Sequence, residues 1–230
     1  MRVNRFVALT TGMSRRAADG VIAEGRVLLN GHPAKLTDQV EETDRLTYNG
    51  HTLEVPQQTI TIMLNKPSGY VTSRQGQGAA TVYSLLPKTY SVLKPIGRLD
   101  KYSTGLLLLS NDGELANRLT HPSFDKQKSY NIKLDKPLTP LHQQMISDQG
   151  VKLEDGNSKL ILEKIDEISA KLWNVRMHEG RNRQIRRTFI TLGYTVTKLH
   201  RIQFGPYSLG NLRQGSYILV NQMGETIKLF

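Results

Sequence analysis

The sequence predicts an α+β protein with two domains, a small one over residues 1–57 and a larger one over residues 58–230. Three observations support this prediction. Two helix signals precede the first strand signals, strand-like runs separated by turn residues fill most of the remaining chain, and residues 55–58 read as a linker. A chain of 230 residues with 38% apolar side chains is long enough to form packed cores.

The small domain is expected to begin with two short helices. Gly12 is expected to end the first helix, and Ser14 is a suitable N-cap for a second helix that runs to about Glu24. Strands are expected at residues 27–29 and 44–48, and an Asn-Gly pair follows each of them. Because Asn-Gly is a strong signal for a two-residue turn, we expect short hairpins to complete this domain.

The larger domain is expected to consist mainly of strands. Residues 106–109 are four consecutive leucines, a pattern typical of a strand that is buried on both faces. One helix is expected to begin after Asp112, its N-cap, and another to span residues 181–192 with Ile185, Phe189 and Leu192 facing inward. Further strand-like runs lie at residues 59–64, 130–134, 160–162, 172–175, 196–202 and 217–220.

The net charge of +11 and the pI of about 9.8 indicate a polyanionic partner. The excess is local, because residues 171–201 contain eight lysines and arginines but one acid, Glu179. Few bulky aromatic side chains accompany these cations, which favours nucleic acid over a membrane surface. No apolar run approaches the roughly 20 residues of a membrane span, and we expect no membrane association. The absence of cysteine excludes disulfides and thiolate catalysis, and a cytoplasmic protein is the default.

One carboxylate stands out as a candidate catalytic group. Asp100 ends the short polar segment Gly-Arg-Leu-Asp, and five residues separate it from the leucine run. The second predicted helix of this domain can supply a cationic partner, because Arg183, Arg186 and Arg187 would fan across the arc opposite its apolar stripe. Two-metal nuclease chemistry needs several converging carboxylates, whereas acids near Asp100 are sparse, so we expect no metal site.

The small domain shows the order helix, Ser-Arg-Arg, helix, strand and Asn-Gly turn, the last four of these over residues 13–31. In this order it resembles the alpha-L RNA-binding domain of a small-subunit ribosomal protein, the protein-four type, which also occurs in many RNA enzymes. Members of that family often begin with Leu-Asp-Lys, where this chain has Val3-Asn4-Arg5. The resemblance implies RNA contacts by Arg15, Arg16, Arg26, Asn30 and Lys35.

Four segments of the larger domain form a series: Asn65-Lys66-Pro67-x-Gly69, Gly97-Arg98-Leu99-Asp100 with Ser103-Thr104-Gly105 and the leucines, Lys128-Ser129-Tyr130, and residues 179–187. In these segments and their order, the domain resembles the RsuA/RluB group of ribosomal RNA pseudouridine synthases, which implies a mixed, mainly antiparallel β-sheet with flanking helices. Residues 150–156 are most similar to the RluB branch, which acts on large-subunit ribosomal RNA. The RsuA branch, which acts on the small subunit, is the alternative.

This resemblance implies isomerisation of uridine to pseudouridine. The bond between uracil nitrogen and ribose breaks, the base turns and a carbon–carbon bond forms, so no cofactor is required. Asp100 is then the essential carboxylate, either as nucleophile on the anomeric carbon or as base on the neighbouring ribose carbon. Family analogy pairs Arg186 with Asp100. By the same analogy, Tyr130 stacks on the target base and Arg98 fills the gap left by an extruded base. RNA contacts are expected from Arg181, Arg183 and Arg187.

We expect a monomer whose partner is ribosomal RNA or a ribosome-assembly intermediate. Three other functions are compatible with a basic chain of this kind: a non-catalytic RNA-binding factor for ribosome assembly, a basic DNA-binding protein and an RNA nuclease. A catalytic role of Asp100 would separate the enzyme from the assembly factor, and a divalent-metal requirement would identify the nuclease.

Overall fold

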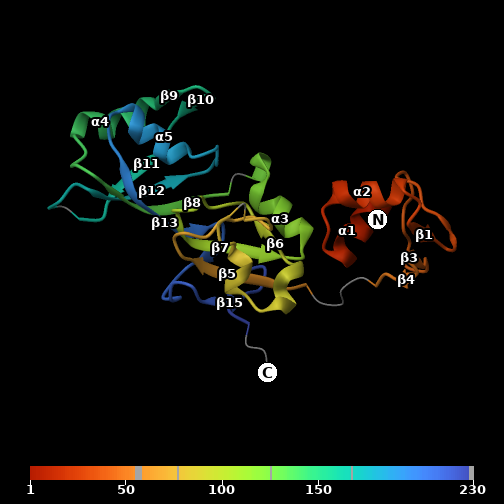
Figure 1. Ribbon diagram of the computed structural model, residues 1–230. Coiled ribbons are helices and arrows are strands. Elements are labelled where there is room, and N and C mark those ends of the chain that lie inside the picture. Colours follow the sequence, from red (N-terminus) through yellow and green to blue (C-terminus); the bar gives the residue numbers. More distant parts are fainter. Residues whose placement is uncertain (55–58, 77, 125, 167, 228–230) are drawn as a thin grey trace. The chain divides into compact units, whose positions relative to one another are not determined.

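The computed structural model describes residues 1–54, 59–76, 78–124, 126–166 and 168–227 (Figure 1). The chain divides into two compact units. The first comprises Met1–Ile60 and Val92–Lys94, and the second comprises Thr61–Ser91 and Pro95–Phe230. The predicted linker at residues 55–58, and with it the predicted domain boundary, lies outside the described residues.

The first unit combines two helices with a small sheet. Helix α1 (Val3–Thr11) ends at Gly12, which has a left-handed φ of 74°. Helix α2 (Arg15–Ala23) begins after Ser14, whose hydroxyl accepts a hydrogen bond from the Ala17 amide. Both predicted helix boundaries are therefore present. The strands are β1 (Val27–Leu29), β2 (His32–Pro33), β3 (Leu46–Tyr48) and β4 (His51–Thr52), in the order β2-β1-β3-β4.

The second unit is built on a nine-stranded sheet. Its strands are β5 (Thr61–Lys66), β6 (Lys94–Ile96), β7 (Thr104–Ser110), β8 (Lys128–Leu134), β11 (Ile161–Lys164), β12 (Leu172–Met177), β13 (Val196–Phe204), β14 (Tyr207–Ser208) and β15 (Tyr217–Leu219). The main path is β11-β12-β8-β13-β7-β5-β15; β14 pairs with β13 and β6 pairs with β7. The β13–β7 pair is parallel and the other pairs along this path are antiparallel, which confirms the predicted α+β class with a mixed, mainly antiparallel sheet.

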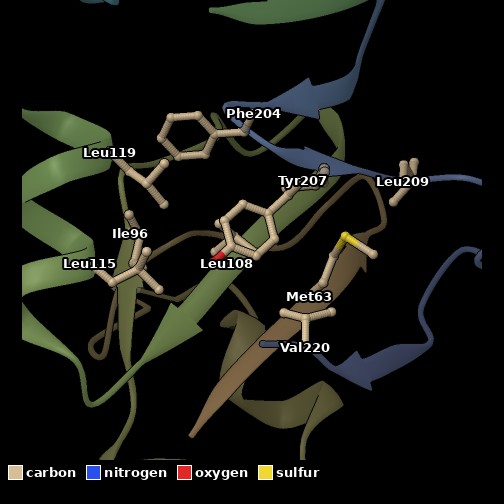
Figure 2. Close-up of a cluster of buried hydrophobic side chains, with 10 residues drawn as sticks. Met63, Ile96, Leu108, Leu115, Leu119, Phe204, Tyr207, Leu209 and Val220 are labelled. Carbon is tan, nitrogen blue, oxygen red and sulfur yellow. The ribbon is translucent and has the colours of Figure 1, made fainter. Parts of the chain in front are cut away.

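The predicted leucine strand lies at the centre of this unit. The four leucines of β7, residues 106–109, are 0% exposed. Helix α3 (Gly113–Thr120) is capped by Asp112, as predicted. The apolar cluster that contains Leu106 and Leu108 of β7 also contains Leu115 and Leu119 of this helix. Figure 2 shows these two leucines beside Ile96, with Phe204, Tyr207 and Leu108 completing the contact between helix and sheet. The strand therefore fixes the loop that precedes it on a rigid base.

Helix α5 (Gln184–Thr191) is shorter than predicted. Arg183 has a left-handed φ of 46°, so residues 181–183 form a turn and the helix begins after them. Ile185 and Phe189 are buried as predicted, whereas Leu192 is only partly buried. The turn separates the arginines of this segment, because those before and after it no longer share one helical face.

The remaining elements are short. A separate hairpin contains β9 (Val151–Leu153) and β10 (Gly156–Ser158). Short helical segments are η1 (Val82–Leu85), η2 (Lys88–Val92), η3 (Pro122–Phe124), α4 (Pro140–Gln144) and η4 (Met145–Gln149). Among the described residues, no helix has both the length and the apolar character needed to cross a membrane.

Candidate active site

A cleft of about 490 Å³ opens in the second unit. Five parts of the chain line it: the loop between β6 and β7, the end of α3, the beginning of β8, the segment from the end of β12 into α5, and β13. The fold thus brings segments that are far apart in the sequence to one place. The predicted site residues that line the cleft are Arg98, Asp100, Tyr130, Arg181 and Arg183.

A buried lysine holds the loop that carries Asp100. The Lys66 side chain at the end of β5 is 0% exposed, and burial lowers its pKa to about 8, a shift that the charge of Asp100 opposes. The sequence motif that contains this lysine did not indicate its role, although the lysine stands between an apolar strand-like run and a proline. Its ammonium donates to the carbonyl oxygens of Pro67 (3.0 Å), Asp100 (3.1 Å), Lys101 (3.2 Å) and Ser103 (2.8 Å).

The Asp100 carboxylate is paired with Arg183. Arg183 Nη1 lies 3.5 Å from Asp100 Oδ2, and the two side chains are 52% and 38% exposed. A substrate can therefore reach the carboxylate. The left-handed backbone of Arg183 directs the chain from the turn into α5, and this places the arginine on the cleft.

The expected ion pair between Arg186 and Asp100 does not form; among the described residues, Arg183 is the cation paired with this carboxylate. Arg186 Nη1 instead donates to the Val196 carbonyl (2.6 Å), and Nη2 lies 3.4 Å from the Ser103 hydroxyl. Burial lowers the pKa of Arg186, the charge of Arg183 lowers it further, and Asp100 raises it. Arg186 thus supports the loop that carries Asp100 through Ser103, and it interacts with Asp100 through its charge.

Arg181 and Arg187, predicted to bind RNA, are engaged within the protein. Both bond to Asp155, at the turn of the β9–β10 hairpin, with Arg181 Nη1 2.9 Å from Oδ1 and Arg187 Nη2 2.6 Å from Oδ2. Arg181 also donates to the carbonyl of Asn157 at 2.8 Å. These contacts fasten the hairpin to α5, a role that the sequence pattern did not indicate.

Tyr130 stands among apolar side chains of the cleft. It is 8% exposed in β8, and its neighbours in the sheet are Val175 of β12 and Arg201 of β13. Ile185 and Leu199 line the same cleft. Tyr130, Ile185 and Leu199 thus give the cleft an apolar surface beside its charged groups. Arg98 is exposed at the cleft.

The residues of the small domain that are predicted to contact RNA lie in the first unit. Arg15, Arg16 and Lys35 are exposed. Arg26 lies over a tyrosine ring and pairs with a glutamate, and Asn30 donates to an aspartate of the same unit. Across the part of the chain that the structure describes, no group of three or more histidine, cysteine, aspartate or glutamate side chains is placed to hold a metal ion.

Comparison with known proteins gives a consistent result. The family described as RNA pseudouridylate synthase matches residues 60–191, more than half of the chain. An "Uncharacterized RNA pseudouridine synthase" of Aquifex aeolicus is 36% identical over 236 residues, which cover 100% of this chain and 94% of the relative. "Ribosomal large subunit pseudouridine synthase B" of Bacillus subtilis is 34% identical over 220 residues, which cover 93% and 89%. A crystal structure described as a pseudouridylate synthase superimposes with a TM-score of 0.69 at 29% identity and covers 96% of each chain.

Proposed function

Because the chain belongs to the RNA pseudouridylate synthase family, we propose that it converts a uridine of ribosomal RNA to pseudouridine, with Asp100 as the essential carboxylate. The proposal rests on the placement of that carboxylate. The Asp100 carboxylate lies at a cleft, 3.5 Å from Arg183, on a loop held by the buried Lys66. A cation at this distance can hold the carboxylate in one orientation, which both of its possible roles require.

The reaction is an intramolecular rearrangement. The bond between the uracil nitrogen and the anomeric carbon breaks, the base rotates, and a carbon–carbon bond to the same ribose replaces it, so atoms and electrons balance without a co-reactant. Asp100 acts either as nucleophile on the anomeric carbon or as base on the neighbouring carbon. Tyr130 stacks on the uracil and restrains it while it turns. Arg183 holds and orients the carboxylate, and Arg186 supports the loop that carries it through Ser103.

The target nucleotide has to leave the RNA stack to enter the cleft. Extrusion costs about a few kcal/mol and is easiest in loops and bulges. Arg98, exposed at the cleft, is suited to filling the vacated position in the stack. Phosphate contacts by basic side chains offset the cost of extrusion, which predicts salt-sensitive binding of structured RNA.

Large-subunit ribosomal RNA is the substrate that we propose, because the Bacillus subtilis relative carries that name and matches along 93% of this chain. The first unit, as an alpha-L type RNA-binding domain, would select the RNA segment through Arg15, Arg16 and Lys35. We further propose that the protein acts as a monomer, and that it does so in the cytoplasm, where the proposed ribosomal RNA substrate is found. Small-subunit ribosomal RNA is the alternative substrate.

The test is an Asp100→Asn variant assayed on ribosomal RNA from cells that lack this protein. Pseudouridine mapping should show one site that is missing in these cells, restored by the parent protein and not by the variant. RNA affinity should stay within about threefold, because the substitution keeps the shape of the side chain and removes no phosphate contact. Activity in a metal chelator distinguishes the isomerase from a nuclease. Equal activity of variant and parent would contradict the proposal, and competition by duplex DNA would favour a DNA-binding function.

A further inference from the structure

A buried arginine lines the cleft and is paired with no carboxylate among the described residues. Arg201 in β13 is 2% exposed, and its Nε donates to the Leu106 carbonyl at 2.7 Å. Its Nη2 is buried and has no hydrogen-bond partner, and within the described residues no carboxylate forms an ion pair with it. A guanidinium does not lose its proton in proteins, so the charge persists.

The surroundings of Arg201 are cationic and aromatic. Its Cζ lies 4.8 Å from the centroid of the Phe204 ring, and Lys128 Nζ lies 5.4 Å from the same centroid. All three residues line the cleft. The ring offers polarisable π surface to both cations but no negative charge.

Arg201 also lies beside the place proposed for the base. In the antiparallel pairing of β13 with β8, Arg201 is opposite Tyr130. Side chains opposite each other in such a pair lie on the same face of the sheet, with Cβ atoms about 5 Å apart. A ligand whose base stacks on Tyr130 therefore has its sugar or phosphate within reach of this guanidinium.

We infer that Arg201 is a phosphate-binding residue, which holds a phosphodiester of the RNA strand next to the target uridine; this inference rests on the proposed function. A buried charge is costly unless it is paired, and arginine forms bidentate contacts with phosphate. A uracil oxygen could accept one hydrogen bond but would leave the charge uncompensated. An RNA phosphate supplies both the acceptor atoms and the negative charge.

The Arg201→Gln variant isolates this charge. Glutamine Nε2 stands at the position of arginine Nε, so the donor to the Leu106 carbonyl is kept while the rest of the guanidinium is lost. Arg213→Gln is the matched control, because it removes an exposed positive charge that does not line the cleft. Both variants are assayed on RNA in which single phosphates around the target uridine are replaced by neutral methylphosphonates.

In the parent protein, one methylphosphonate next to the target should lower kcat/KM about tenfold or more, as expected for loss of a charge-assisted hydrogen bond. In Arg201→Gln, the unmodified RNA should show a similar loss, and the methylphosphonate should add little to it. Arg213→Gln should respond to the methylphosphonate as the parent does. The melting temperature of RNA-free Arg201→Gln should not fall, because the parent charge has no counter-charge there.

Additive losses in the variant would overturn the inference, as would a parent protein insensitive to every methylphosphonate near the target. The scan on the parent keeps the inference falsifiable even if Arg201→Gln does not fold, because it needs no variant. Failure of the proposed function is separate, because the parent would then not isomerise the unmodified RNA.

Discussion

At the scale of single residues, Asp100 depends on Lys66 as well as on Arg183. The arginine contacts the carboxylate itself, whereas the lysine fixes the backbone that presents it. The Lys66 ammonium shares its three N–H groups among four carbonyl oxygens, so its loss would leave buried and partly buried acceptors without this donor. Such acceptors cost about 1–3 kcal/mol each when they stay dry.

We therefore predict that Lys66→Met lowers the free energy of unfolding by about 3 kcal/mol and lowers kcat by about 100-fold. The second effect follows because displacement of a catalytic group by about 1 Å costs that much. Lys101→Met is the control, since it removes an exposed charge from the same loop. Chemical denaturation and single-turnover assays measure the two quantities. Equal behaviour of the two variants would show that Lys66 does not hold the loop.

The pH dependence of the parent tests the same lysine. Turnover should fall as the pH rises through about 8, because the neutral amine keeps fewer donors and no charge. The folded pKa is below the usual 10.5, so the unfolded chain binds more protons between about pH 8 and 10.5. The contribution of Lys66 to the free energy of unfolding therefore rises with pH in that window. If turnover falls with rising pH while the free energy of unfolding does not, the loop has loosened in a protein that is still folded.

At the scale of elements, the β9–β10 hairpin and α5 act as one piece through Asp155. The hydrogen bond from Arg187 holds the pKa of Asp155 below its usual value, and the charges of Arg181 and Arg187 add to this. The stabilisation is therefore present above the ordinary pKa of an aspartate and is lost as the pH falls through the lowered value. The hairpin should loosen in acid before the central sheet does.

Arg187→Gln should accelerate amide hydrogen exchange in residues 151–158 and leave the salt dependence of RNA binding unchanged, because this guanidinium is already bonded to Asp155. Arg15→Gln is the comparison. Its side chain is exposed on the first unit, and its loss should reduce the slope of log affinity against log salt by about 1. If Arg187→Gln reduced the slope as much, the RNA contact expected from sequence would be correct.

The same element shows where sequence reasoning succeeds and where it stops. The apolar period of Ile185 and Phe189 predicts helix α5, because burial of a helical stripe follows from spacing alone. The left-handed Arg183 could not be predicted, since arginine has no preference for that conformation. That single dihedral angle decides which arginine meets Asp100 and which one bonds elsewhere.

At the scale of the whole molecule, the four leucines and the cap residues predict the α+β class, because burial and capping are local signals. The pairing of distant strands is not local, and it is this pairing that places Arg201 beside Tyr130. The hydrogen bonds of Lys66 likewise join residues far apart in the sequence, such as Lys66 and Ser103. The motifs therefore indicated the candidate site, whereas the contacts within it required the fold.

The division into two units predicts that removal of residues 1–60 leaves a folded second unit. Its sheet and cleft come from later residues, so the truncated protein should still isomerise a short RNA that contains the target uridine, in an Asp100-dependent way.

The affinity of the truncated protein for full-length ribosomal RNA should fall, because exposed cations such as Arg15 and Arg16 are lost. The full chain with both arginines replaced by alanine is the matched variant, and it should reproduce most of that fall while staying folded. Circular dichroism and filter binding at several salt concentrations measure these effects. A truncated protein that fails to fold would show that the second unit needs the first. Unchanged affinity of a folded truncated protein would show that the second unit alone selects the RNA.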